Sequence, residues 1–91
     1  MDFQYEKGRI FAEDATGKLL AEITFPVTDG VAVIDHTFVD DSLRGQGVAD
    51  QLVTAAVTQL RSQGVRVVPV CSYAQRWFST HPGQSDVLGK S

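Results

Sequence analysis

The sequence predicts an α+β fold, in which a mixed, mostly antiparallel sheet contains a strand–loop–helix–strand unit. Residues 1–40 hold apolar, β-branched runs separated by turn residues, a pattern typical of strands. From residue 48 to residue 63, apolar residues recur at helical spacing instead. A second β-branched run, at 65–70, follows at once, so the chain returns to the sheet after a right-handed crossover.

The first 40 residues predict an antiparallel meander. Residues 3–12 form one strand or a short hairpin, because Lys7-Gly8 interrupts their apolar run. Residues 14–18 have turn chemistry, and residues 19–25 alternate loosely as a second strand. Asp29-Gly30 is a hairpin signal between apolar runs. Residues 31–39 are long and β-branched, so we expect one continuous central strand there.

The helix at 48–63 and the residues after it complete the predicted core. Gly64 occupies the place of a glycine that ends a helix. Pro69 lacks an N–H, which indicates a sheet edge or a strand end at that point. Ser72 is the expected N-cap of a short helix at 73–80, and the remaining chain is expected to be loosely ordered.

The bulk properties predict one domain over residues 1–91 and exclude several classes of protein. The net charge of −3 argues against binding to nucleic acid or to an anionic membrane through the overall field. One cysteine rules out an internal disulfide and fits a cytoplasmic protein. No signal peptide, membrane span or metal-ligand spacing is evident. We expect a monomer or a weak homodimer.

The connection Arg44-Gly45-Gln46-Gly47-Val48-Ala49 is the strongest candidate site. A helix N-terminus has free N–H groups and a partial positive charge, and glycines let a phosphate approach the backbone closely. The Arg44 side chain would add a cation. Two turn glycines leading into a helix would look the same, so the pattern alone leaves both interpretations open.

Two familiar phosphate loops do not match. A P-loop requires Lys-Ser/Thr after its second glycine, where this chain has Val48-Ala49. The dinucleotide fingerprint requires a third glycine, where this chain has Asp50. The loop on its own therefore indicates an anion site without naming the ligand.

With its flanking segments, the loop resembles the GNAT superfamily of N-acetyltransferases. The cofactor motif of that superfamily, Gln/Arg-x-x-Gly-x-Gly/Ala, is matched by Arg44, Gly47 and Ala49. Segments 35–39, 43–49, 69–73 and 81–82 have the order and spacing of its short, minimal YjdJ-type group. The resemblance covers nearly the whole chain.

This resemblance implies that the chain binds acetyl-CoA in a cleft where two parallel strands splay apart. The acetyl group would pass to an amine of a small molecule or a protein lysine. The strand end would bond the pantetheine arm through its backbone, and the loop would hold the pyrophosphate. The implied cofactor-binding residues are Thr37, Phe38, Val39, Arg44, Gly45, Gln46, Gly47, Val48, Ala49 and Tyr73.

Cys71 and His36 are the candidate catalytic residues. The Cys71 thiolate is placed to accept the acetyl group, or to lie beside the cofactor sulfur without reacting. A lone cysteine is also a common small buried residue. His36 has a side chain suited to a general base, and a structural histidine is the alternative.

The chain is shorter than a usual GNAT enzyme and has no helices between its first strands to shape an acceptor pocket. Two functions therefore remain open at this point. One is an N-acetyltransferase, and the other is a CoA-binding or acyl-CoA-binding module with little or no catalysis.

Overall fold

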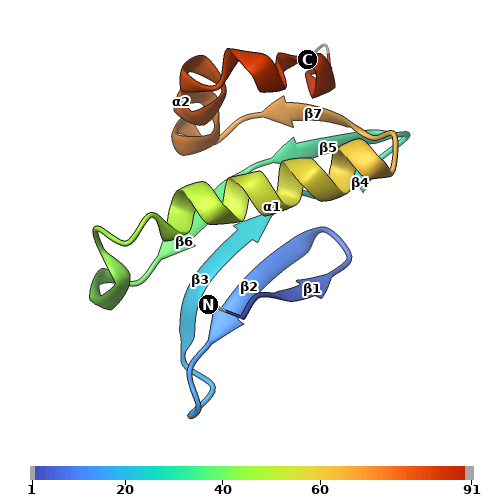
Figure 1. Ribbon diagram of the computed structural model, residues 1–91. Helices are drawn as coiled ribbons and strands as arrows, with labels where there is room; N and C mark the ends of the chain where they lie inside the picture. Colours follow the sequence, from blue (N-terminus) through green and yellow to red (C-terminus); the bar gives the residue numbers. More distant parts are fainter. Residues whose placement is uncertain (1, 90–91) are drawn as a thin grey trace.

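The computed structural model describes residues 2–89 and has the expected α+β architecture, shown in Figure 1. Two sheets lie under one long helix, α1 (Val48–Ser62). The four-stranded sheet has the order β1-β2-β3-β6, and the three-stranded sheet has the order β4-β5-β7. The strands are β1 (Gln4–Glu6), β2 (Arg9–Glu13), β3 (Leu19–Thr24), β4 (Val27–Thr28), β5 (Val31–Ile34), β6 (His36–Val39) and β7 (Arg66–Pro69).

The predicted meander is present, with a hairpin at its start. β1 and β2 pair antiparallel around the interruption at Lys7-Gly8, and β3 pairs antiparallel with β2. The turn between β4 and β5 places Asp29 at φ 54° and Gly30 at φ 78°. Two positive φ angles in succession are the signature of the hairpin turn that Asp-Gly favours.

The prediction of one continuous strand over 31–39 is wrong, because the run breaks at Asp35. β5 pairs with β4 and β7, whereas β6 pairs only with β3. Asp35 and His36 are both exposed, so the inward–outward alternation shifts by one residue at this point. The Asp35 side chain accepts a hydrogen bond from the Thr24 hydroxyl, and its N–H donates to the Thr24 carbonyl.

The predicted parallel crossover joins β5 to β7 through α1. Their register runs from Val31 opposite Arg66 to Ile34 opposite Pro69, where β7 ends as the proline indicated. The N–H groups of Val70 and Cys71 both donate to the Ile34 carbonyl. Beyond that point β6 has left for the other sheet, so β6 and β7 diverge with no ladder between them.

The core lies between α1 and the two sheets. Six α1 residues are buried, as the helical spacing predicted for most of them: Val48, Leu52, Val53, Ala56, Val57 and Leu60. They meet buried strand residues, among them Ile10, Ile23 and Ile34. Full burial of each such side chain stabilises the fold by about 1.5–3 kcal/mol. This packing fixes the direction of α1 and so positions its N-terminus.

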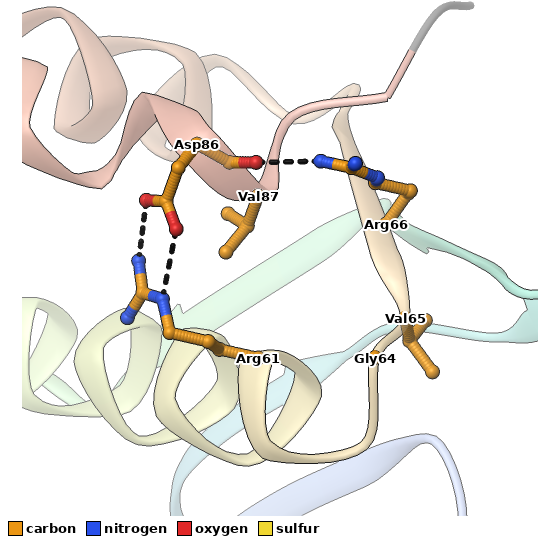
Figure 2. A pocket seen from close by; sticks show the side chains of 6 residues that line it. All are labelled: Arg61, Gly64, Val65, Arg66, Asp86 and Val87. Carbon is orange, nitrogen blue, oxygen red and sulfur yellow. Dashed lines mark hydrogen bonds and ion pairs between the residues drawn. The ribbon is translucent and has the colours of Figure 1, made fainter.

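The C-terminal residues are more ordered than expected, up to the last described residue. After α2 (Ser72–Thr80), a 3-10 helix η2 (Pro82–Val87) packs back on the chain. Figure 2 shows Arg61 on both Asp86 carboxylate oxygens, at 2.9 and 3.2 Å, and Arg66 on the Asp86 carbonyl. The Arg61 hydrogen bond lowers the pKa of Asp86 below its ordinary value. Ion pairs that join sequence-distant residues are hard to read from local patterns.

The N-cap of α2 also differs from the prediction. Ser72 is already the first residue of α2, and the cap is Cys71, whose Sγ accepts a hydrogen bond from the Ala74 N–H at 3.3 Å. Sulfur is a weak acceptor, which is why a neighbouring serine looked the better cap in the sequence. Within residues 2–89, no helix has the length and apolar character needed to cross a bilayer.

Candidate functional site

The start of α1 is an open, glycine-built backbone cradle. Gly45 and Gly47 have φ angles of +83° and +71°, which side-chain-bearing residues rarely adopt. A Cβ at either position would meet no heavy atom within 4 Å, so the space beside the loop is free. Gly47 is the N-cap of α1, and no side chain caps this helix end. The first N–H groups of α1 therefore point at a space that suits an anion.

A cavity of about 200 Å³ lies against this helix start. Its lining combines the loop, the end of β6 and the first turn of α2: Val39, Leu43, Arg44, Gly45, Gly47, Val48, Ala49, Asp50 and Tyr73. The Arg44 guanidinium is exposed and pairs with the Asp41 carboxylate at 2.7 Å. The positive charge of Arg44 is thus at the mouth of the cavity, where the Asp41 carboxylate partly neutralises it.

The free edge of β6 leads toward this cavity. β6 is the last strand of its sheet, so among residues 2–89 no strand pairs with the edge away from β3. Thr37 and Val39 are half-buried on the α1 side of β6, and Phe38 is partly exposed on the other face. The predicted cofactor residues of the strand and of the loop therefore lie along one continuous path.

Cys71 lies beside this path. Its Sγ is 3.5 Å from the Thr37 Oγ1 on β6, which links the two diverging strands at their point of separation. The Ala74 N–H donates to the same sulfur. The thiol is therefore half-buried, hydrogen-bonded and located at a helix N-terminus.

His36 is on the opposite face of β6. Side chains alternate along a strand, so His36 faces away from Thr37 and Cys71. Its Nε2 is 3.4 Å from Glu22 Oε1 on β3, and the other oxygen of Glu22 accepts from Arg9. No hydrogen bond or ion pair joins His36 to Cys71 within residues 2–89. Sequence reasoning missed Glu22, although a charged residue inside an apolar strand is a visible signal.

Tyr73 lies between two cavities that share it with Asp50. One is the cavity at the start of α1, and the other, of about 240 Å³, is lined by α1 and α2 residues that include Arg76 and His81. Burial and the Asp50 carboxylate together raise the pKa of Tyr73. The phenol therefore stays protonated and able to donate a hydrogen at neutral pH.

A polar cluster that the sequence patterns did not indicate joins α1 to α2. The Trp77 indole N–H donates to Asp50 Oδ1 at 2.6 Å. His81 stacks on the Trp77 ring at 4.2 Å, and its Nε2 is 3.7 Å from the same Asp50 oxygen. Asp50 is far from Trp77 and His81 in the sequence, so only the packing of α1 against α2 brings it to them. Within the described part of the chain, no group of three or more acidic, cysteine or histidine side chains has metal-binding geometry.

Comparison with known proteins places the chain among acetyltransferases. A family model described as GCN5-related N-acetyl-transferase matches residues 9–87. The solution structure of a GCN5-like candidate N-acetyltransferase from Staphylococcus aureus is 30% identical, with a TM-score of 0.80. The match covers 99% of this chain and 89% of that one. Among curated protein sequences, none matches significantly.

Larger acetyltransferases share the core. A GNAT family N-acetyltransferase from Escherichia coli, solved in complex with CoA, is 25% identical with a TM-score of 0.63. An acetyltransferase from Bacillus cereus is 23% identical with a TM-score of 0.67. The matches cover 80% and 84% of this chain, but only 47% and 56% of those proteins. The chain thus spans about half the length of these two acetyltransferases, and the YjdJ-type group stays a prediction.

Proposed function

Because this chain belongs to the GCN5-related N-acetyltransferase family, we propose that it binds acetyl-CoA and transfers the acetyl group to an amine. The observation that carries the proposal is the uncapped start of α1, which opens beside the unpaired edge of β6. A pyrophosphate and an extended pantetheine arm need these two features next to each other. The family indicates acetyl-CoA as the ligand, and the geometry indicates where it would bind.

In this proposal the residues from Arg44 to Ala49 hold the pyrophosphate through backbone N–H groups. The two glycines leave room for phosphate oxygens, and the dipole of α1 favours their charge. A backbone site suits a chain whose net charge is −3, because the attraction is local. Arg44 adds a cation at the cavity mouth once its pairing with Asp41 is exchanged for phosphate.

The pantetheine arm then follows the free edge of β6. Backbone groups of Thr37 and Val39 point away from β3 and provide donors and acceptors that no strand in residues 2–89 uses, whereas those of Phe38 face Glu22 on β3. An arm laid on this edge ends beside Cys71 and Tyr73. The thioester of bound acetyl-CoA therefore reaches the point where β6 and β7 separate.

The transfer step has two routes from there. In direct transfer the amine nitrogen bonds to the thioester carbon, the carbon–sulfur bond breaks, and the CoA sulfur leaves with a proton. In the covalent route the Cys71 sulfur bonds to the thioester carbon and CoA leaves as the thiol; the amine nitrogen then bonds to that carbon, the bond to the Cys71 sulfur breaks, and the sulfur regains its proton. A half-buried thiol that accepts a helix N–H supports the covalent route. Tyr73, which lines the cavity and whose raised pKa keeps it protonated, is the proposed donor of the proton to the leaving sulfur.

His36 is the proposed base for the acceptor amine. It faces the side of β6 away from Cys71, so the acceptor would approach from that face. Glu22 would orient the imidazole through its contact with Nε2. The amine nitrogen would reach the thioester carbon around the free edge of β6, and Glu22 would have a positioning role.

A CoA-binding module with little catalysis is the second candidate. The observation in its favour is the exposed setting of His36, whose side chain is 52% exposed. An open acceptor face gives little orientation to an amine. For the acetyltransferase, the proposed acceptor is an amine of a small molecule or of a protein lysine.

Two measurements test the proposal. Isothermal titration with acetyl-CoA should show one site, and absence of heat at millimolar ligand would remove both candidates. A free-thiol assay over a panel of amines and lysine peptides then separates enzyme from binding module. For the enzyme, His36→Ala should lower kcat with little change in KM for acetyl-CoA, and Glu22→Gln, which weakens the contact that orients His36, should lower kcat by a smaller factor. Glu13→Gln, on the same sheet but exposed at the end of β2, is the matched control.

A further inference from the structure

The first turn of α1 contains an acid that is held away from the helix end. Asp50 is the third residue of α1, a position from which a carboxylate can bind the free N–H groups of its own helix. No such cap is present, and Asp50 Oδ1 accepts the Trp77 indole N–H at 2.6 Å instead. The acid thus faces α2, although an anion would be stabilised at the start of α1.

The Trp77 side chain, which donates to Asp50, is held in place by its neighbours. Trp77 is 3% exposed, and its ring packs edge-on against Phe78. His81 stacks on the other side of the indole, and its Nδ1 is 2.7 Å from the Trp77 carbonyl. A carbonyl only accepts, so Nδ1 carries the hydrogen and Nε2 faces Asp50. The indole N–H is therefore a donor of fixed direction.

We propose that Trp77 is a positioning residue for cofactor binding: its indole N–H holds the Asp50 carboxylate against α2 and keeps the start of α1 free for the pyrophosphate. This inference rests on the proposed function. Without the indole N–H, Asp50 would rotate onto the helix N–H groups and compete with phosphate. Its negative charge would also repel the ligand from a shorter distance.

A double-mutant cycle with acetyl-CoA tests this role. Trp77→Phe should weaken binding about fivefold, which is the scale of one charge moved a few ångström at a solvated site. Asp50→Asn alone should strengthen binding severalfold, because it removes a negative charge that lines the cavity. The double variant should bind like Asp50→Asn, so removal of the carboxylate rescues the loss of the indole. Added salt should weaken the Trp77→Phe defect.

The alternative is a purely structural role for Trp77. In that case the double variant would still bind about fivefold more weakly than Asp50→Asn, and this result would overturn the proposal. If Trp77→Phe does not fold, benzothienylalanine at position 77 keeps the ring shape and removes only the N–H. The chain has one tryptophan, so biosynthetic replacement changes that position alone. Binding by the analogue protein equal to wild type would also overturn the proposal. Wild-type protein that fails to bind acetyl-CoA would instead contradict the proposed function.

Discussion

Individual side chains around the start of α1 and α2 are tuned by contacts between the two helices. Tyr73 illustrates this, because its pKa is raised first by burial and then by the carboxylate of Asp50. Neither cause is visible in the sequence, where the two residues are far apart. Cys71 is similar: as a lone cysteine it suggested a buried residue or a nucleophile, and the structure places it on Thr37 and at a helix start.

The Tyr73 contact predicts a measurable titration shift. Asp50→Asn should lower the pKa of Tyr73, because it removes the nearby negative charge, while burial still keeps that pKa above its ordinary value. Ultraviolet absorbance titration reports the phenolate. Tyr5→Phe is the background for this measurement, since the chain has two tyrosines. An identical titration curve with and without Asp50 would contradict the contact.

Cys71 gives a second prediction at this scale. Cys71→Ala removes the cap of α2 and should cost about 1 kcal/mol of folding free energy, whereas Cys71→Ser keeps an acceptor and should cost less. In the covalent route, wild type incubated with acetyl-CoA gains an acetyl group in intact-protein mass spectrometry, and Cys71→Ala does not. An acetylated Cys71→Ala protein would exclude Cys71 as the acceptor. Equal turnover by wild type and both variants would favour direct transfer.

Among the elements, α1 carries the site, and its two ends can be compared directly. Each end has a left-handed glycine in open space: Gly47 at φ +71° and Gly64 at φ +70°. The local strain of a substitution is therefore the same at both ends, whereas only the first faces the proposed pyrophosphate site. This makes Gly64 a matched control for Gly47.

Gly47→Ala and Gly64→Ala should each lose about 1–2 kcal/mol of stability in denaturant unfolding, because alanine is strained in the left-handed backbone conformation. Only Gly47→Ala should weaken acetyl-CoA binding, by about tenfold or roughly 1.4 kcal/mol, since its Cβ enters the phosphate space. Calorimetry measures the affinity. Equal affinity of the two variants would argue against the loop as the pyrophosphate site.

The docking of η2 on α1 predicts an acid dependence. The pKa of Asp86 is lowered by Arg61, so the carboxylate stabilises the fold above its unfolded pKa of about 3.9 and loses this effect as the pH falls through the lower folded value. Asp14 and Asp40 act in the same direction. The melting temperature should therefore fall on acidification below about pH 4, and less steeply in Asp86→Asn. An unchanged acid slope in Asp86→Asn would show that the ion pair in Figure 2 adds nothing in solution.

At the scale of the whole molecule, the chain is small, so binding of the proposed cofactor should add a large fraction of its unfolding free energy. A domain of 91 residues buries a modest share of its surface, so ligand binding should be evident in its unfolding. The proposed ligand would also touch β6 of one sheet and α2, the helix that follows β7 of the other sheet, and would link the two parts. Ligand-free protein should accordingly be the less stable form.

Acetyl-CoA at about 100 times its dissociation constant should add about 2.7 kcal/mol to the unfolding free energy. For a domain of this size, the melting temperature should rise by about 10–20 °C in a thermal shift or calorimetric scan. Adenosine, which lacks the pyrophosphate, is the control and should give little shift. A shift of equal size with adenosine would show that pyrophosphate contacts at the α1 loop contribute little to the affinity.

The sequence by itself predicted the α+β class, the meander, the crossover through α1 and the glycine loop at the helix start. These features depend on local periodicity and on turn chemistry, which neighbouring residues carry. The consecutive polar residues Asp35 and His36 indicated the break, but the β-branched residues around them favoured one continuous strand. Only the tertiary structure placed His36 and Cys71 on opposite faces of β6, and only it joined Asp50 to Trp77. Contacts of that kind depend on how helices and sheets pack, and packing brings together residues whose separation in the chain leaves no local signal.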